Sequence, residues 1–432
     1  MSRRSVTGRF PVLARRDFRL LLADRLIAPG AVAFSMVGVS FAVLDAGRSA
    51  ADLSYVLAAQ IAPSLVFTLL GGVVADRIAP QRVIAGANVM IAVGEGTFGI
   101  LVLCGHPGLW VMILLETVTG TGMAVFYPAS QALLPAVAPG ELLQQGSAMS
   151  RLAMNAAQMA GSAVAGVVVA AVGPGWALAT CGAGVVTTVP LLLAIRAAAP
   201  VRETGTSVLA DIREGWTEFR SHTWLWAIVG QYCVVMMAWY GAFQVLGPVV
   251  AKTDLGGPAA WGAITAAESV GLVAGGLVAM RRVPRRPMLF VVAIGAVIGV
   301  SPLSLAMLWP LPLICVASFG VGTLTEIMMV VWTVAMARNI PPGMLARVSG
   351  YDALGSFLAT PAGALAAGPL AAAIGVRRAQ YAAAGAILAV SALTVIPRDV
   401  RGMPPGAPAP VPPPVPGSVP VPGSVPVAGT EP

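Results

Sequence analysis

The sequence predicts an all-α membrane protein: twelve transmembrane helices in two parallel, pseudo-symmetric six-helix halves around a central cavity. Of the 432 residues, 57% are hydrophobic and only 10% are charged, whereas soluble domains average about 25% charged residues. Long apolar runs recur along the chain, and the mean hydropathy is +0.84. The alternating pattern of barrel strands is absent, so these runs must be helices, because lipid cannot hydrogen-bond an open backbone. The composition excludes a cytosolic globular enzyme, a disordered chain and a nucleic-acid-binding module.

The apolar runs are each long enough to cross a bilayer, which takes about 20 residues per helix. Taken in order, the expected spans are 26–44, 53–74, 83–104, 107–128, 147–172, 174–195, 223–250, 259–280, 287–309, 311–336, 348–374 and 378–396. The first run is too long for the core of a cleaved signal peptide, so we interpret it as the first span.

The basic residues indicate the orientation. All but Lys252 are arginines, and they cluster between the apolar runs. With the amino terminus inside, the cytoplasmic segments hold 22 basic residues and the outer segments hold 4. Positive charge favours the cytoplasmic side. We therefore expect a multi-pass protein of the cell inner (cytoplasmic) membrane with both termini in the cytoplasm.

Four segments follow from this pattern. Residues 1–195 form an N-terminal six-helix half and residues 223–400 a C-terminal six-helix half. Residues 196–222 form a cytoplasmic linker, in which Val208, Ile212, Trp216 and Phe219 recur at helical spacing and predict an amphipathic helix on the membrane face. The tail, residues 401–432, is rich in proline and is predicted to be disordered.

The halves resemble repeats. Residues 71–77 are similar to residues 275–281, and residues 139–142 are similar to residues 342–345, at nearly the same offset. Each pair lies on the same side of the predicted membrane, which indicates parallel repeats.

A short motif lies between the second and third spans. Gly72 is followed by Asp76 and Arg77, and then by Arg82. With twelve spans and a polar central loop, this motif resembles the signature loop of the major facilitator superfamily of transporters. The resemblance implies a cytoplasmic gate, in which Asp76 caps the start of span 11 near Asp352, since a helix N-terminus favours negative charge.

Two stretches narrow the resemblance. The arginine-rich lead-in to the first span, and residues 126–152, are similar to the branch that holds siderophore exporters and macrolide efflux proteins. At two places the sequence departs from patterns that are common in this superfamily. Glu116 occupies a position at which many proton-coupled members carry arginine, and residues 161–166 depart from the Gly-Pro-x-x-Gly-Gly pattern of many exporters.

Acidic residues within the spans mark the expected pathway. A charge at mid-bilayer costs roughly 2.5–3.5 kcal/mol, so such residues face a cavity or a partner. The resemblance implies that spans 3, 6, 9 and 12 lie outside the cavity, which makes Glu116, Glu268 and Glu326 the expected proton or substrate groups; buried, protonated structural acids are the alternative. Glu95 is expected to bond between helices instead. With no arginine at mid-depth, the cavity is expected to be electronegative. The other candidate pathway residues are Gln60, Asn155, Tyr240 and Gln244.

The resemblance implies a secondary active transporter, its branch implies export, and the acidic residues within the spans favour protons as the coupling ion. We expect proton-coupled efflux of a small amphipathic compound, such as a drug, an antibiotic or a siderophore-like metabolite, by alternating access. Its partners would be that small molecule, protons and the lipid bilayer, with no nucleic acid, and the protein would act as a monomer. The alternatives are an uptake carrier for a small nutrient and an intramembrane enzyme or receptor. We expect no cofactor, no metal and no catalytic residue, because the cysteines and histidines are scattered.

Overall fold

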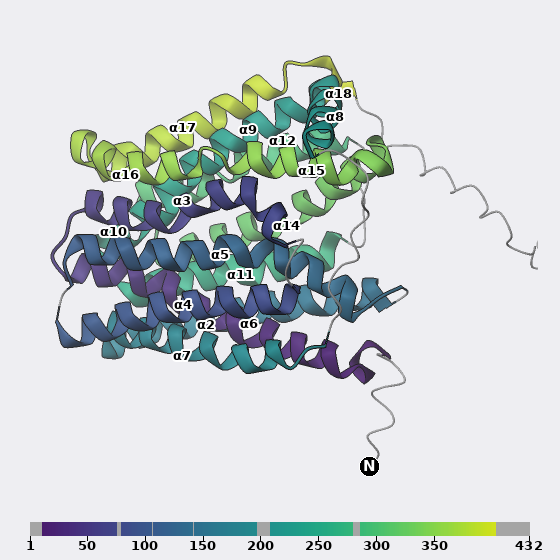
Figure 1. Cartoon of the computed structure of the whole chain (residues 1–432). Coiled ribbons are helices and arrows are strands. Elements are labelled where there is room, and N and C mark those ends of the chain that lie inside the picture. The colour runs from purple at the N-terminus through teal and green to yellow at the C-terminus, as the bar shows by residue number, and fades with distance from the viewer. Residues whose placement is uncertain are drawn as a thin grey trace, which may run out of the picture.

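The structure, a computed structural model, describes residues 11–75, 79–105, 107–140, 142–196, 208–279 and 286–402. In these ranges the regular structure is entirely helical. The long helices lie side by side along one direction, and the connections gather at the two ends of the bundle (Figure 1). The tail beyond Gly402, predicted to be disordered, lies outside the described residues.

The first set of long helices, which we call the N-terminal group, covers the first six predicted spans. After the short turn η1 (Pro11–Ala14), its members are α2 (Arg16–Asp45), α3 (Ala50–Ala75), α4 (Pro80–Cys104), α5 (Leu109–Val137), α6 (Leu142–Val172) and α7 (Pro174–Leu193).

The second set, which we call the C-terminal group, follows the linker helix α8 (Val208–Ser221) and covers the other six predicted spans. Its members are α9 (Thr223–Trp239), η2 (Tyr240–Val245), α10 (Leu246–Asp254), α11 (Pro258–Ala279), α12 (Pro287–Val297), α13 (Val300–Ala306), α14 (Leu311–Asn339), α15 (Pro342–Phe357), α16 (Thr360–Ile374) and α17 (Val376–Thr394), before the short α18 (Arg398–Gly402).

The protein is a multi-pass membrane protein. Within the described residues, ten helical segments are long and apolar enough to cross a membrane. Two further long helices, α3 and α17, are not among the ten. Helix α17 begins with Arg377 and Arg378, which lower its mean hydropathy. The count of exactly twelve spans therefore stays a prediction.

Glycine and proline set several helix boundaries. Gly173 has a φ of +93°, which ends α6, and Pro174 then opens α7. Gly375 has a φ of +89° and separates α16 from α17. Glycine adopts positive φ without steric cost, and proline fits the first helical turn because no hydrogen bond is lost there. These short connections make consecutive helices antiparallel.

Three predicted spans are not single regular α-helices. A π-helix, η2, lies between α9 and α10. The span that begins at Pro287 breaks at Ile298–Gly299, and the span that begins near Arg347 breaks at Leu358–Ala359, just before Pro361. Proline removes a backbone donor and clashes with the preceding turn, so a helix breaks on its N-terminal side.

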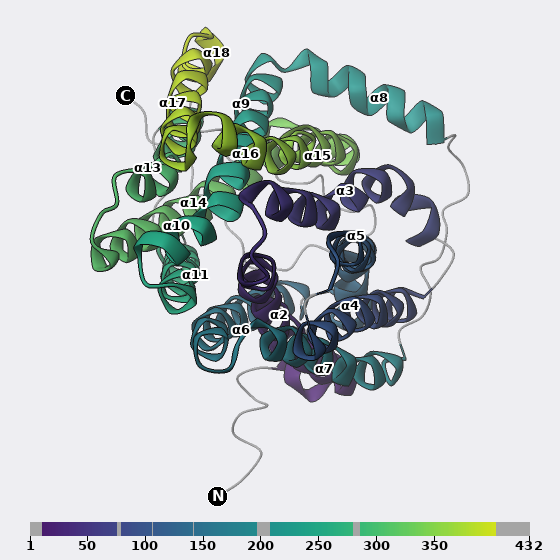
Figure 2. The same cartoon turned by 90° about the vertical axis from the view of Figure 1, so that its left-hand side faces the viewer.

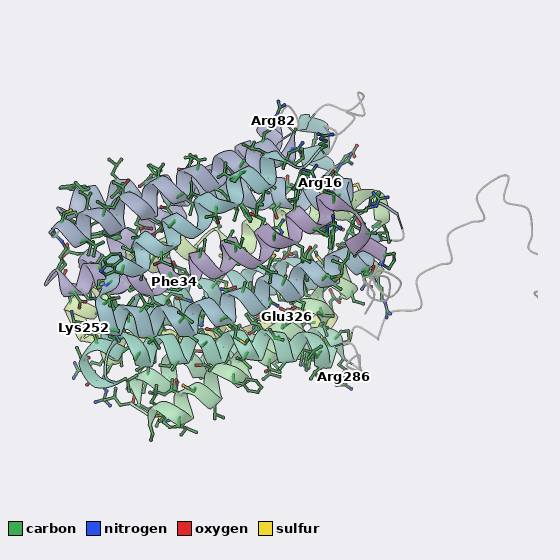
Figure 3. The ribbon with its side chains drawn as sticks, turned by 90° about the horizontal axis from the view of Figure 1, so that it is seen from below. Arg16, Phe34, Arg82, Lys252, Arg286 and Glu326 are labelled. Atoms are coloured by element: carbon green, nitrogen blue, oxygen red, sulfur yellow. The ribbon has the colours of Figure 1, made fainter. Side chains whose placement is uncertain are left out.

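The charges distinguish the two ends of the bundle. Arg16, Arg82 and Arg286 lie at one end, which we call the Arg-rich end, and Lys252 lies at the other, which we call the Lys252 end (Figure 3). Arg286 directly precedes α12, and Arg16 begins α2. The sequence predicts that the Arg-rich end faces the cytoplasm.

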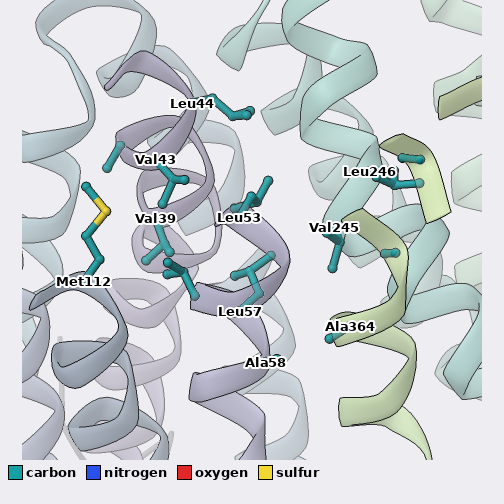
Figure 4. Close-up of a cluster of buried hydrophobic side chains, with 14 of the residues drawn as sticks. Val39, Val43, Leu44, Leu53, Leu57, Ala58, Met112, Val245, Leu246 and Ala364 are labelled. Carbon is teal, nitrogen blue, oxygen red and sulfur yellow. The ribbon is translucent and has the colours of Figure 1, made fainter. Parts of the chain in front are cut away.

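At the Lys252 end the two groups share apolar cores. One cluster joins Val43 and Leu53 of the N-terminal group to Leu246 and Ala364 of the C-terminal group (Figure 4). A second joins Phe41 and Ala165 to Phe243, Trp261 and other residues of the C-terminal group. Helices α3 and α16 lie side by side, as do α6 and α11 (Figure 2).

At the Arg-rich end the described residues form separate cores. The cluster around Phe18 and Ile84 draws only on the N-terminal segments. The cluster around Trp224 and Trp332 draws only on the C-terminal group and its flanking helices α8 and α18. The two groups are therefore packed together mainly at one end.

The linker helix α8 crosses the bundle axis and docks on α15 (Figures 1 and 2). Arg347 Nη1 donates to Glu214 Oε2 at 2.7 Å. The ring of Tyr351 lies 5.5 Å from that of Trp216 and 5.9 Å from that of Phe219. The sequence predicts this amphipathic helix on the membrane face, but Phe219 is buried against protein. The side chains of Val208 and Ile212 lie outside the described set.

Candidate functional site

The predicted gate motif is only partly described. Gly72 lies in the last turns of α3, and Arg82 is exposed in the first turn of α4. Asp76 and Arg77 lie outside the described residues, so their contact with α15 stays a prediction. The predicted partner of Asp76, Asp352, lies well inside α15 rather than at the N-terminus of that helix.

Asp352 has partners within the C-terminal group. Trp332 Nε1 donates to its Oδ2 at 3.0 Å. Ser356 Oγ donates to its Oδ1 at 3.4 Å. The described residues supply Asp352 with no ion-pair partner.

Glu116 is fully buried between α5 and α3. Gln60 Nε2 donates to Glu116 Oε2 at 2.7 Å, which joins two predicted pathway residues. The other oxygen, Oε1, has no hydrogen-bond partner among the described atoms. A Cβ on Gly120 would overlap the backbone of Gln60, so the glycine lets the two helices approach closely enough for this bond.

Glu95 bonds between helices, as the sequence predicts. Ser35 Oγ of α2 donates to Glu95 Oε1 of α4 at 2.6 Å. Glu95 is also fully buried, and its Oε2 has no hydrogen-bond partner among the described atoms. The adjacent Gly94 lies against Thr119 of α5, one helical turn beyond Glu116. The N-terminal group thus encloses two carboxyl groups that have polar neutral partners.

Glu268 and Glu326 lie on the adjacent helices α11 and α14. Glu268 is half-buried and makes no hydrogen bond or ion pair within the described part of the chain. Glu326 differs, because Arg151 Nη1 of α6 lies 3.7 Å from its Oε1. Figure 3 places Glu326 between mid-bundle and the Arg-rich end. The prediction that no arginine reaches these acids is therefore wrong for Glu326: the long side chain of Arg151 extends from its helix to the carboxylate.

The other predicted pathway residues fall into two places. Asn155 lies on α6, one turn beyond Arg151, and is half-buried. Tyr240 and Gln244 both lie on the π-helix η2 and are half-buried. π-helical turns are rare and often occur at functional sites. Tyr240 packs against the shared apolar cluster at the Lys252 end.

Sequence reasoning missed a buried polar network in the N-terminal group. Asp24 and Arg25 of α2 are both buried. Asn88 Nδ2 donates to Asp24 Oδ1 at 3.3 Å and to Thr188 Oγ1 at 2.7 Å. Arg25 donates to Ser130 Oγ. The sequence signal that could have indicated this network was the adjacent acid and base, Asp24 and Arg25, just before the predicted start of the first span.

No metal centre is formed by the described residues, which contain no group of three or more potential ligands. Cys104, Cys181, Cys233 and Cys315 are all free thiols. Only Cys181 is buried, whereas Cys104 is exposed, so the expectation of four buried cysteines is wrong for Cys104.

The fold and these sites together define a class of protein. It is a multi-pass helical membrane protein in which two groups of helices pack together mainly at one end and buried polar side chains bond between the helices. A sequence profile of the Major Facilitator Superfamily matches residues 26–360, most of the chain. The chain belongs to this superfamily, and it is a transporter of small molecules rather than an enzyme.

Two relatives are exporters by name. The chain is 27% identical over 377 residues to the multidrug efflux pump Tap of Mycolicibacterium fortuitum, covering 84% of this chain and 90% of Tap. It is 25% identical over 308 residues to the enterobactin exporter EntS of Escherichia coli O1:K1 / APEC, covering 69% of this chain and 73% of EntS.

Solved structures share the fold. A crystal structure of the nucleoside transporter NupG has a TM-score of 0.68 at 11% identity and covers 88% of this chain and 98% of that one. A bacterial homologue of the human lysosomal transporter Spinster has a TM-score of 0.66 at 14% identity, and the match covers 89% of this chain and 97% of the homologue.

Proposed function

We propose that this transporter exports a small amphipathic compound by alternating access and that protons flowing inward drive it. The names of two relatives, a multidrug efflux pump and an enterobactin exporter, support the direction. The substrate would be a drug, an antibiotic or a siderophore-like metabolite.

The observation that carries this proposal is the unequal packing of the two ends. Shared cores hold the two groups together at the Lys252 end, whereas each group has its own core at the Arg-rich end. Alternating access is largely a rocking of two helix bundles around a fixed site. The arrangement suits a state that is closed toward the outside and accessible from the cytoplasm, which is the state in which an exporter loads its substrate.

Proton coupling is supported by the acids that lack a basic partner. Glu116 bonds only to the neutral Gln60, and Glu268 bonds to no described residue. An ionised carboxylate without a counter-ion is costly in lipid, so such groups favour the neutral, protonated form. A change in their surroundings during rocking would release the proton. Glu326 differs, because the nearby guanidinium of Arg151 favours its ionised form.

The topology belongs to the same proposal. Twelve spans in two parallel halves, residues 1–195 and 223–400, would place both termini in the cytoplasm, with the chain acting as a monomer in the inner membrane. Residues 196–222 would link the halves, and residues 401–432 would form a free tail.

The test uses inside-out membrane vesicles that contain the full-length protein, with the amphipathic dye ethidium as the transported probe. An acidic lumen should drive ethidium into vesicles that hold the wild-type protein, and a protonophore should abolish this uptake. Glutamine mimics a permanently protonated glutamate. We therefore expect Glu116→Gln or Glu268→Gln to lose the dependence of uptake on lumenal pH while the protein still reaches the membrane.

Glu326→Gln is the matched comparison, because a basic side chain, that of Arg151, lies 3.7 Å from its carboxylate. Unchanged pH dependence in all three variants would reject the coupling role. Dye accumulation in right-side-out vesicles alone would reverse the proposed direction.

A further inference from the structure

A partly open cavity of about 240 Å³ lies within the C-terminal group, lined by residues of α9, α12, α14 and α15. Its volume equals the share of about eight molecules in liquid water. It belongs to neither the Glu116 site nor the Glu326 ion pair. We call it the Asp352 cavity, after the one acidic residue in its wall.

The wall of the Asp352 cavity is rich in aromatic rings and methionines. Tyr232 and Phe357 meet edge to face, with ring centroids 6.2 Å apart and planes at 90°. Trp332 and Met328 are buried in the wall, whereas Met329 and Phe357 are exposed. A ligand in this cavity would therefore contact aromatic and methionine side chains.

Asp352 gives the cavity its charge. Both its oxygens accept hydrogen bonds from neutral donors, Trp332 and Ser356. No basic side chain of the described residues pairs with it. Arg347, the arginine in the same helix, forms an ion pair with Glu214 on α8. Among the described residues, the carboxylate of Asp352 therefore lines the cavity without a basic partner.

The break between α15 and α16 also favours a cation in this cavity. Helix α15 ends at Phe357, so its last turn, which includes Ser356 and Phe357, borders the cavity. The C-terminal end of a helix carries partial negative charge and favours cations. Aromatic faces attract cations too, most strongly when the cation is desolvated.

We propose that the Asp352 cavity binds an organic cation with an apolar body, with the positive group next to Asp352 and the body against Trp332, Tyr232 and Phe357. This site deepens the export proposal, on which it rests for its role, by naming the class of substrate. It gives Asp352 a function in recognition that is separate from the predicted gate contact.

The test measures binding rather than transport. Purified full-length protein in lipid nanodiscs is titrated calorimetrically with benzyltrimethylammonium and with N,N-dimethylbenzylamine N-oxide. The two probes have nearly the same shape, but only the first has a net positive charge. The wild-type protein should bind the cation roughly tenfold or more tightly than the N-oxide, since a hydrogen bond or contact to a charged group is worth more than a neutral one.

Asp352→Asn should weaken cation binding roughly tenfold or more and leave N-oxide binding unchanged. Asp399→Asn is the control, because it removes one carboxylate from the exposed surface of α18. Phe357→Leu provides a second variant that preserves an apolar side chain at the rim. It should also weaken cation binding, through loss of the ring.

A wild-type protein that does not prefer the cation overturns the proposal, even if Asp352→Asn fails to fold. Equal losses in Asp352→Asn and Asp399→Asn, or no loss in Asp352→Asn, overturn it as well. If the cation binds through Asp352 but the vesicles export nothing, the export proposal falls and the site stands. If the vesicles export ethidium and the purified protein shows no charge preference, the site falls and the export proposal stands.

Discussion

The two ends of the bundle are closed by different means. At the Lys252 end, apolar side chains from both groups interlock, and glycines bring backbones into contact. Toward the Arg-rich end, the described ion pair between the groups is Arg151–Glu326, while the Glu214–Arg347 pair holds the linker helix on α15. Apolar interlocking contributes over a large area, whereas exposed ion pairs contribute about 0–1 kcal/mol each. The Lys252 end should therefore be the harder end to open in this state.

The largest expected effect comes from removing a buried ring. Phe243 lies in a shared core and Phe18 in a core of the N-terminal group alone, and both are fully buried. Phe243→Ala and Phe18→Ala should each lower the free energy of unfolding by about 3–5 kcal/mol. Only Phe243→Ala should also open the Lys252 end.

A reporter of opening is Ser54→Cys in a protein without its four native cysteines. Ser54 is fully buried near Gly368 at that end. Its labelling by a membrane-impermeant maleimide from outside should rise in Phe243→Ala and stay low in Phe18→Ala. Equal labelling in the two variants would mean that the shared core does not control closure.

A smaller effect should follow from one added methyl group between α6 and α11. A Cβ on Gly166 would lie 2.8 Å from Gly262 Cα, and the backbone there cannot move aside as a side chain can. Overpacking of this kind costs about 1–3 kcal/mol. Gly166→Ala should shift the equilibrium roughly 5- to 150-fold toward the state open at the Lys252 end.

The matched control for this substitution is Gly230→Ala in α9, because a Cβ there would meet no atom within 4 Å. Ser54→Cys labelling should rise in the first variant only. If Gly166→Ala labels like the control, the glycine contact is not part of the closure.

The smallest effect should come from the ion pair at the same end. Lys252 Nζ donates to Asp45 Oδ1 at 2.6 Å, but the side chains remain 37% and 41% exposed. Such a pair contributes about 0–1 kcal/mol and is screened by salt. Lys252→Gln should therefore raise Ser54→Cys labelling by about fivefold at most. The difference from wild type should vanish at 1 M salt, where the screening length is about 3 Å.

The exchange Asp45→Lys with Lys252→Asp is the complementary measurement. It should restore the wild-type labelling, because the two charges attract in either order. A difference that persists at high salt would instead assign the effect to the packing of the lysine stem.

Much of the fold could be predicted because lipid permits few alternatives. Each apolar run had to be a helix, and the observed Leu311–Asn339 and Pro258–Ala279 begin within one residue of the predicted starts. The helix breaks before Pro302 and Pro361 had a visible signal in those prolines. No residue in the sequence signalled the π-helix at Tyr240–Val245, because it depends on tertiary packing such as that of Gly241 against Gly363.

The site was predicted less completely, because periodicity places a residue in a span without choosing its partner. Glu95 was expected to bond between helices, and it does so through Ser35. The Gln60–Glu116 bond depends on the rotation of α3 relative to α5, which the sequence does not encode locally. The Arg151–Glu326 pair was missed because residues from distant parts of the chain meet only in the packed bundle.

The lysine at the closed end has a chemical consequence. Lys252 is the only lysine in the chain, so it carries the only side-chain primary amine. An amine-reactive fluorophore therefore labels the side chains of this protein at one place, beside Asp45, without any engineered residue. The free thiols and the arginines do not form such stable amide products. Apart from the terminal α-amino group, the wild-type sequence thus provides one attachment point for such a reagent, at the Lys252 end.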